Sequence, residues 1–323
     1  MVDDTLPFDP NSELDARVTP TPLSDPVLTA IFQNAEVSGL AIRSLINATL
    51  EDSGDKPIRE VVSVTPQSVH SETSTRGFRI DVEVRAADGE IVLVEVQRKL
   101  FTSTNERTLL YVEQSLASGA KRGVALSEVT AAMPRVIAVN ILEKAIRAVG
   151  GFHQVVELTY REPPYERATD RLEVHNLELS KFRELKMEDL TKPLQCWLTA
   201  LCRSQDREAT LREVVKMDAQ LQLYYEHDPG FAQFVDRYGT VVSMPELRKA
   251  YRRWEYDIMV EKLEEERNAA KYAAQLAERE ARGEKAKAFA IARNLLSMNL
   301  PLGQIVTATG LTLEEVESLR ITP

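Results

Sequence analysis

The sequence predicts an α/β core followed by a helical C-terminal extension. Residues 78–97 contain two runs in which apolar side chains occupy every second position, separated by a Gly-containing turn, as in a β-hairpin. Apolar residues at three- and four-residue intervals on both sides of this segment predict helices. Beyond about residue 185 the strand pattern ends and the helical pattern continues. The 323-residue length allows about two domains, or one larger domain with an appendage.

The first half of the chain supplies the elements of the core. Residues 1–24 contain four prolines without apolar periodicity, so we expect a flexible leader. Residues 25–50 predict one or two amphipathic helices, and residues 105–119 predict a helix after the hairpin. The remaining strands are expected at 58–64, 134–142, 153–160 and 171–177. Together, residues 25–185 are predicted to form the α/β core.

The second half predicts three helical regions. Residues 186–254 are mostly helical in pattern, and residues 255–288, rich in Glu, Lys, Arg and Ala, suit a long charged helix or a coiled coil. Residues 289–323 predict a helix-turn-helix-like tail whose last helix begins with a capping box at Thr312 and Glu315. Three acids on that helix argue against insertion into a DNA groove, so we expect packing or self-association instead.

Charge and composition restrict the class of protein. The formal net charge is −10, but residues 1–60 hold eleven acids and four bases, which leaves −3 for the rest. A local DNA-binding surface therefore remains compatible with the composition. The acidic N-terminus is unlike a signal peptide, and no apolar run approaches the roughly 18 residues needed to span a bilayer. With only two cysteines, Cys196 and Cys202, in positions unsuited to a disulfide or a zinc pair, the expected location is cytoplasmic.

Two carboxylates are predicted to meet at the end of the hairpin. A three-residue loop with Gly89 in the left-handed conformation places Asp81 opposite Glu95, and side chains so paired lie about 4.5–5.5 Å apart at Cβ. The valines of both strands fall on the other face. Close carboxylates repel, so protonation, a cation such as Arg79, or a divalent metal must offset the repulsion. Mg²⁺ prefers such oxygen ligands.

Two neighbours extend this predicted site. Gln97 lies on the face of Glu95 and could position a water molecule, and Lys99 could supply positive charge if the strand continues. The alternative is an ordinary solvated sheet face, in which the two acids pair with Arg79, Arg85 or Lys99. Spacing alone leaves both interpretations open.

The hairpin and its surroundings resemble a known family. The segment RIDVEVRAADGEIVLVEVQRK, residues 79–99, looks like the D…ExQ form of the PD-(D/E)xK motif, in particular that of the recombination-promoting nuclease (Rpn) and transposase family. The helices near residues 25–50, the segment ERTLLYVEQSLASG, the segment LELSKF with Ser180 where proline is commoner, and the tail from residue 292 are also similar. The order of these segments is more specific than the short motif.

The resemblance implies a restriction-endonuclease-like core, with a central mixed sheet flanked by helices, and Mg²⁺-dependent DNA cleavage, with Mn²⁺ as an alternative ion. Asp81 and Glu95 would be metal ligands, and Gln97 would occupy the position of the usual lysine. Glutamine cannot act as a cation or general base, so the base is unassigned. An acid of the first helix often completes such sites: Asp25 fits best, and Glu36 competes with it.

Two further surfaces gain an interpretation from the resemblance. Arg107, Tyr111 and Gln114 share one helix face, which would border the site, with Arg107 contacting a phosphate and Gln114 the metal-bound water. Otherwise they form an ordinary polar stripe. The segment RKAYRRW, residues 248–254, interleaves basic and aromatic residues, which suits phosphate contact and base stacking, although such runs usually form a solvated helix face.

The predicted function is therefore a metal-dependent DNA endonuclease that hydrolyses phosphodiester bonds, in recombination or mobile-element biology. Its catalytic residues would be Asp81, Glu95, Gln97 and Lys99. The rival hypothesis is a nuclease-derived protein that no longer cuts and acts by binding DNA or by self-association, which the absent lysine motivates. In either case DNA is the expected partner, no membrane is involved, and the C-terminal helices are expected to form a homo-oligomer.

Overall fold

The computed structural model describes residues 9, 12–15, 18–70, 78–98, 104–118, 124–185, 191–203 and 210–321. The chain divides between Glu255 and Tyr256 into two compact units, which are described separately below. Among the described residues, no helix combines the length and the apolar character needed to cross a membrane.

A six-stranded mixed sheet forms the centre of the first unit. Its strands are β1 (Val61–His70), β2 (Phe78–Ala86), β3 (Ile91–Gln97), β4 (Val136–Leu142), β5 (His153–Glu157) and β6 (Leu172–Glu178). The order across the sheet is β1-β2-β3-β4-β6-β5. The central strands β3, β4 and β6 run parallel, whereas β1, β2 and β5 run antiparallel to their neighbours. Parallel strands need covered faces, and all residues of β4 and β6 are buried.

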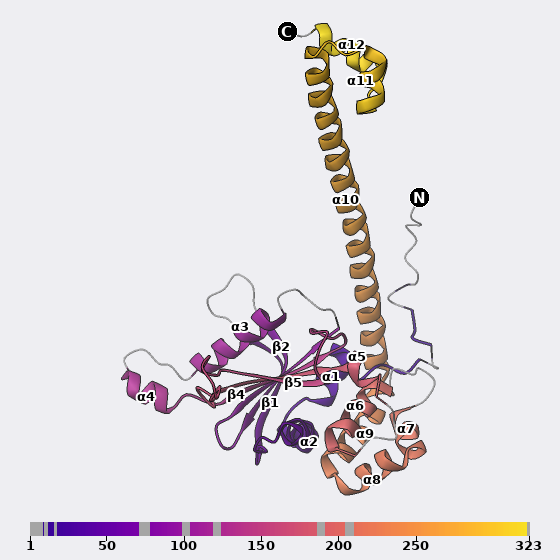
Figure 1. Ribbon diagram of the computed structural model, residues 1–323. Helices are drawn as coiled ribbons and strands as arrows, with labels where there is room; N and C mark the ends of the chain where they lie inside the picture. Colours follow the sequence, from indigo (N-terminus) through magenta and orange to yellow (C-terminus); the bar gives the residue numbers. More distant parts are fainter. Residues whose placement is uncertain are drawn as a thin grey trace. The chain divides into compact units, whose positions relative to one another are not determined.

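Helices cover both faces of the sheet (Figure 1). They are α1 (Asp25–Ile31), α2 (Ala35–Ser53), α3 (Thr104–Ala117), α4 (Leu126–Ala131), α5 (Leu179–Phe182), α6 (Pro193–Arg203), α7 (Leu211–Met217), α8 (Ala219–His227) and α9 (Pro229–Val242). One buried cluster joins α2 to the even-numbered valines of β2 and β3 and to Ile137 and Val139 of β4. On the other face, Tyr111 and Val112 of α3 pack on Ile91, Leu93 and Ala138. We call these the α2 face and the α3 face.

The helices α6 to α9 pack on the outer side of α2. Trp197 of α6 is fully buried and donates from Nε1 to Oγ of Ser44 on α2 at 3.0 Å. Gly230 of α9 allows the close approach of α9 to α2, because a Cβ at this position would lie 2.3 Å from the carbonyl oxygen of Leu40. Burial of these helices on α2 extends the core of the sheet into a helical layer.

Part of the predicted leader is held by this layer. Leu14 and Leu23 are buried in the cluster of the α2 face. The hydroxyl of Tyr238 donates to the carbonyl oxygen of Pro20 at 2.6 Å, and Arg248 donates to that of Asp15 at 2.7 Å. Leu14, Asp15, Pro20 and Leu23 thus contact the folded unit, where the sequence had suggested flexibility.

The second unit consists of the later part of α10 (Pro245–Ser297) with α11 (Leu302–Thr309) and α12 (Leu313–Ile321). Its small core contains Ala292, Ile305, Leu311 and Val316. Gly310 ends α11 with φ of 68°, in the left-handed region that glycine favours. Thr312 and Glu315 form the predicted capping box through two reciprocal hydrogen bonds.

The predicted fold class is confirmed: the first unit has a restriction-endonuclease-like α/β fold with helical segments after it. Helix α10 runs without a break through residues 245–297, including Gly283, and so continues across the boundaries expected at residues 254 and 288. A helix rich in Ala, Glu and Lys tolerates one glycine, whose cost is only about 1 kcal/mol.

Candidate active site

The β2–β3 hairpin has the predicted register until it reaches the two carboxylates. Val82 pairs with Val94 and Val84 with Val92, around a loop in which Gly89 has φ of 84°. At the next position, Asp81 and Glu95 are joined by hydrogen bonds from main-chain amides to their carboxylates, and not by main-chain pairing. The amide of Asp81 donates to Oε2 of Glu95 at 3.2 Å, and the amide of Val96 donates to Oδ2 of Asp81 at 2.7 Å.

The surrounding residues show why the carboxylates meet there. Ile80 packs on the α3 face whereas Val82 packs on the α2 face, so the alternation of β2 is interrupted at Asp81. Each carboxylate then accepts from the main chain of the opposite strand, which fixes both side chains at the end of the hairpin. The predicted closeness of Asp81 and Glu95 is thus present, although through side chains and not through a paired ladder.

Glu95 lies in an environment that disfavours its charge. It is 5% exposed. Burial, followed by the negative charge of Asp81, raises the pKa of Glu95 to about 8, whereas Arg107 acts in the opposite direction. Arg107 Nη2 lies 2.8 Å from Glu95 Oε1. A buried carboxyl with a strongly raised pKa in a polar cluster is typical of a functional site.

The α3 face brings together the three residues that shared one predicted helix face. Besides its ion pair with Glu95, Arg107 donates from Nε to the hydroxyl of Tyr111 at 2.7 Å. Tyr111 is 4% exposed. Gln114, one turn further along α3, has a buried Oε1 without a hydrogen bond among the described residues. This arrangement fits the site-bordering interpretation of the stripe better than a solvated face.

Gln97 ends β3 and is held by the start of α3. Its Oε1 accepts from Oγ1 of Thr104 at 3.1 Å, and within the described chain its buried Nε2 has no hydrogen-bond partner. Lys99, the fourth predicted catalytic residue, lies outside the described residues, as does the side chain of Arg79. Among the described residues, the cation paired with Glu95 is Arg107, which the resemblance had placed at the border of the site as a phosphate contact.

Two asparagines that the sequence analysis missed continue the polar cluster. Asn140 of β4 and Asn176 of β6 are buried on the α3 face beside Glu95 and share a hydrogen bond of 2.9 Å. Asn140 also donates to Oγ1 of Thr108 on α3 at 3.1 Å. The signal was present in the sequence for Asn140, which interrupts an apolar strand near its carboxyl end, where ligands bind in open α/β sheets.

Of the two first-helix acids, Asp25 is the one near the carboxylate pair. Its negative charge contributes to the raised pKa of Glu95. Asp25 also lines an open pocket of about 410 Å³ whose wall includes Pro26 and Trp254. Glu36 is exposed in the first turn of α2 and does not line this pocket.

The basic and aromatic segment 248–254 lies in the first turns of α10, and its side chains have different surroundings. Tyr251 is buried, and Arg248 and Arg252 bind the chain near residues 12–15. Trp254 is half-buried beside the pocket of Asp25, and the guanidinium of Arg98, the residue after Gln97, lies 4.6 Å from its ring centroid. Arg248, Tyr251 and Arg252 therefore have structural roles, and Trp254 lines the pocket that Asp25 also lines.

The carboxylate pair offers oxygen ligands of the type that a divalent ion binds. Asp81 and Glu95 offer carboxylate oxygens, each with more than one lone pair, and Asp25 lies close enough to affect Glu95 electrostatically. Hard oxygens of this type are what Mg²⁺ binds. Burial and the neighbouring charge of Asp81 raise the pKa of Glu95, and a divalent ion between the two carboxylates would offset their repulsion.

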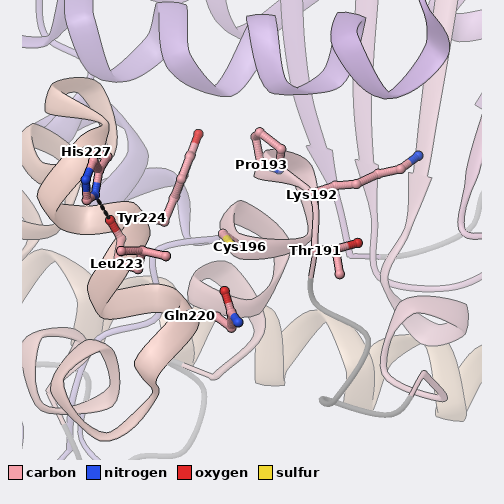
Figure 2. Close-up of a pocket in the computed structure, with 8 residues that line it drawn as sticks. All are labelled: Thr191, Lys192, Pro193, Cys196, Gln220, Leu223, Tyr224 and His227. Atoms are coloured by element: carbon pink, nitrogen blue, oxygen red, sulfur yellow. Dashed lines mark hydrogen bonds between the residues drawn. The ribbon is translucent and has the colours of Figure 1, made fainter.

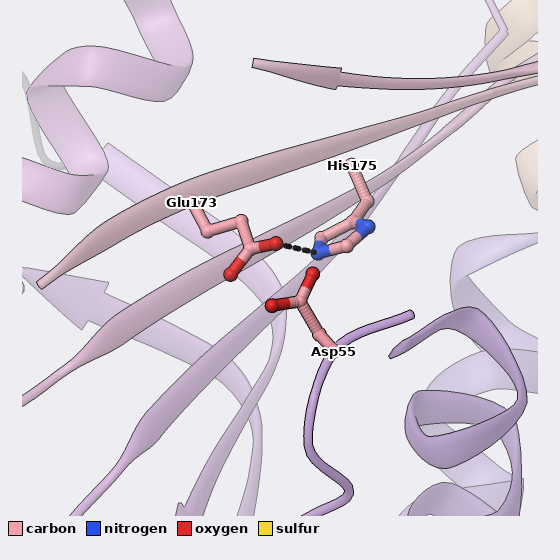
Figure 3. A group of neighbouring side chains, drawn as sticks. All are labelled: Asp55, Glu173 and His175. Carbon is pink, nitrogen blue, oxygen red and sulfur yellow. Dashed lines mark ion pairs between the residues drawn. The ribbon is translucent and has the colours of Figure 1, made fainter. Parts of the chain in front are cut away.

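A second group of titratable side chains lies on the α2 face. Asp55 follows α2, and Glu173 and His175 lie on β6, with their side chains directed at one another (Figure 3). The four histidines of the sequence lack metal-ligand spacing, so no role was predicted for them. The missing signal was long-range: His153 and His175 come together only because β5 pairs with β6.

A cavity of about 300 Å³ between the start of α6 and α8 carries no comparable chemistry (Figure 2). Lys192 on its rim is bound to Asp52 at 2.8 Å. Burial raises the pKa of the Cys196 thiol to about 11, so this cysteine is a poor nucleophile. His227 uses Nδ1 at 2.8 Å from the carbonyl oxygen of Leu223, within its own helix.

Comparison with known families decides the identity of the fold. The family model of PD-(D/E)XK nuclease family transposases matches residues 22–273. The chain belongs to this family. Comparison with curated proteins and with solved structures gave no significant match. The family supports a nuclease-type function, with a divalent metal ion and DNA as substrate, and the matched span includes every candidate residue named above.

Proposed function

We propose that this family member is a Mg²⁺-dependent DNA endonuclease whose metal ligands are Asp81 and Glu95, completed by Asp25. The observation that carries the proposal is the carboxylate pair formed by Asp81, near the start of β2, and Glu95, near the end of β3. Each carboxylate accepts a hydrogen bond from a main-chain amide of the opposite strand, and the pKa of Glu95 is raised to about 8. Such a pair is costly to the fold in isolation, which supports a role that uses it.

The metal ion, when bound, would activate a water molecule and stabilise the charge that develops on the phosphodiester. The protein groups around it have separate tasks. Arg107 sits 36% exposed beside Glu95, so it can turn from that carboxylate to a phosphate oxygen. Tyr111 orients the guanidinium through its 2.7 Å hydrogen bond. Arg107 would thus bind the substrate where negative charge increases.

Gln97 and Gln114 would position the attacking water. Thr104 holds Oε1 of Gln97, which leaves the Nε2 donor of Gln97 for another group. Gln114 offers its Oε1 acceptor. An amide can orient water but cannot remove its proton, so no side chain in this set is assigned as general base. Lys99 is retained in the proposal as a source of positive charge.

The decisive experiment incubates purified protein with supercoiled plasmid and Mg²⁺, and compares Asp81→Ala and Glu95→Ala with the unmodified chain. We expect each variant to lose about 10³-fold in cleavage rate, because a metal ion contributes several kcal/mol to the transition state. Glu83→Gln is the matched control: it removes another buried carboxylate from β2, one that pairs with Arg85 at 2.8 Å. Cleavage that persists in both alanine variants would refute the assignment.

A second candidate function rests on one observation. Arg107 already occupies one oxygen of Glu95 through its 2.8 Å ion pair, which fits a nuclease-derived protein that binds DNA without cutting it, as does the glutamine at the position of the usual lysine. This rival predicts DNA binding unaffected by Mg²⁺ and no cleavage by the unmodified chain under any divalent ion. Self-association through residues 255–320 belongs to both proposals, and a monomer by light scattering at micromolar concentration would contradict it.

A further inference from the structure

The cluster of Asp55, Glu173 and His175 is separated from the candidate active site by the sheet itself. Glu173 lies beside Ile137 and His175 beside Val139 in the β4–β6 pairing, and both partners belong to the core of the α2 face. Glu95 and Asn140, in contrast, lie on the α3 face. A site at this cluster would therefore be independent of the proposed nuclease centre.

The three side chains present ligand atoms to one common point. One carboxylate oxygen each of Asp55 and Glu173 and one ring nitrogen of His175 all lie within 4.8 Å of one another (Figure 3). Glu173 and His175 are fully buried. Within the described part of the chain, neither Oε1 of Glu173 nor Nε2 of His175 makes a hydrogen bond, although the two atoms are only 3.3 Å apart.

A count of protons explains this unsatisfied contact. Asp52, His153, His175 and Glu173 form a row with three contacts: 2.7 Å from Asp52 to Nδ1 of His153, 3.0 Å between the rings, and 3.3 Å from His175 to Glu173. Two neutral imidazoles carry two N–H protons, so one contact has none. When the protons lie in the two shorter contacts, His153 donates to Asp52 and His175 donates from Nδ1 to His153. Nε2 of His175 then presents its lone pair to the carboxylates.

We propose that Asp55, Glu173 and His175 bind a divalent transition-metal ion, for which Zn²⁺ is the best fit. A histidine that binds a metal usually donates its other N–H to a neighbour, and His175 can donate from Nδ1 to His153, which in turn donates to Asp52. Three protein ligands with one open position are common for zinc. The imidazole nitrogen favours Zn²⁺ over Mg²⁺.

The charge balance of the cluster also leaves room for a cation. Two guanidinium groups, those of Arg135 and Arg167, face four carboxylates. The carboxylates are those of Asp55, Glu90, Glu157 and Glu173. With neutral histidines the group carries a net charge of −2, which one divalent ion would cancel. Arg135 binds Oε2 of Glu173 at 2.6 Å, whereas Oε1 of that carboxylate lies 3.3 Å from Nε2 of His175 and 3.4 Å from Nη2 of Arg167.

Zinc titration of the full chain tests this site apart from the nuclease centre. The background is the double variant Asp81→Asn, Glu95→Gln, which removes the other carboxylate pair. By isothermal titration calorimetry we expect this protein to bind one equivalent of Zn²⁺ and to bind Mg²⁺ far more weakly. X-ray absorption at the zinc edge should show one imidazole nitrogen among oxygen ligands.

Single changes in this background assign the ligands. Asp55→Ala should abolish stoichiometric binding, and it is suited to the test because Asp55 is partly exposed and its loss leaves the buried pair in place. His153→Asn should weaken binding about 10- to 100-fold, the usual effect of removing the partner of a ligating histidine. Glu90→Gln is the matched control, because Glu90 pairs with Arg135 but does not belong to the triad.

The alternative is that no metal ion binds and that Arg135 and Arg167 alone balance the charge of the carboxylates. Absence of Zn²⁺ binding in the double variant would overturn the proposal, and so would zinc that is retained at full affinity after Asp55→Ala. His175→Gln provides a second check: loss of the nitrogen signal at the zinc edge supports His175 as a ligand, and an unchanged spectrum contradicts it. Because Asp81 and Glu95 are absent from this background, the outcome does not depend on nuclease activity.

Discussion

Two carboxylate clusters occupy opposite faces of one sheet and hold their charge differently. On the α3 face, burial and the neighbouring Asp81 raise the pKa of Glu95 to about 8, and Arg107 offsets this only in part. On the α2 face, Glu173 is buried at least as deeply, yet its interactions with His175, Asp55 and Arg135 outweigh the effect of burial and lower its pKa.

The difference teaches that burial alone does not set the charge state of a carboxylate. The charge state also depends on the number of hydrogen-bond donors and cations directed at the carboxylate, because each of them favours the ionised form. Glu173 is supported by donors on several sides, whereas Glu95 has Arg107 and one main-chain amide. Glu95, which has fewer donors than Glu173, is therefore the carboxylate whose ionised form an added metal ion would stabilise more. This is the site at which we propose catalysis.

The largest expected effect on stability comes from the arginine of the α2 face. Arg135→Met leaves Glu173 buried without its shortest ion pair, so we expect a loss of about 3–5 kcal/mol in the free energy of unfolding. Arg107→Met should cost at most about 1 kcal/mol, because its side chain is 36% exposed and the pair is partly screened. Urea unfolding in the presence of EDTA measures both, and equal losses would remove the contrast between the two clusters.

Glu95→Gln should raise stability at alkaline pH while it abolishes cleavage. Glu95 keeps its proton in the folded chain up to a pKa of about 8, whereas the unfolded chain releases it near 4.5. Between these values the folded state binds more protons, so its stability falls as pH rises. The neutral amide escapes this loss, although Arg107 must then be solvated.

Melting temperatures of metal-free protein at pH 5, 7 and 9 check this prediction. Each kcal/mol corresponds to about 2–4 °C for a unit of this size. The gain of Glu95→Gln over the unmodified chain should grow with pH, and Glu83→Gln serves as the control because that carboxylate already pairs with Arg85. A gain that does not change with pH would show that Glu95 is ionised throughout.

Arg107→Met should move the pH dependence of cleavage to higher pH. Arg107 lowers the pKa of Glu95, so its removal makes Glu95 release its proton later and shifts the acid limb of the rate profile upwards at fixed Mg²⁺. The salt slope of DNA binding should also fall by about 1 if Arg107 contacts a phosphate. Arg98→Met, which removes an exposed cation from the face of Trp254, should leave the acid limb in place.

The hairpin site could be predicted from the sequence because it depends on local rules. A period of two, a three-residue loop and Gly89 determine which residues face each other, and the observed pairing of Val82 with Val94 agrees. The shared face of Arg107, Tyr111 and Gln114 follows equally from helical geometry. What spacing could not predict is that Arg107 reaches Glu95, because that contact depends on how α3 docks on β4.

The cluster of the α2 face lay beyond sequence reasoning for a topological reason. β6 inserts between β4 and β5, so His175 becomes the neighbour of His153 and faces Asp55 from the end of α2. The order of strands in a sheet depends on which faces the helices cover, and a single sequence does not reveal it. Asn140 could have been identified from the sequence, because it is a polar residue in an otherwise apolar strand.

The smallest predicted effect separates the two acids of the first helices. Asp25→Asn removes a negative charge that raises the pKa of Glu95, so the acid limb of the cleavage profile should move slightly to lower pH, opposite to the effect of Arg107→Met. If Asp25 is also a ligand, the Mg²⁺ concentration for half-maximal cleavage should rise. Glu36→Gln is matched to it, because both acids lie in the first turn of a helix and each change should cost about 0.3–1 kcal/mol there. Only Asp25→Asn should change the metal requirement; the same change in Glu36→Gln would assign the third carboxylate to α2.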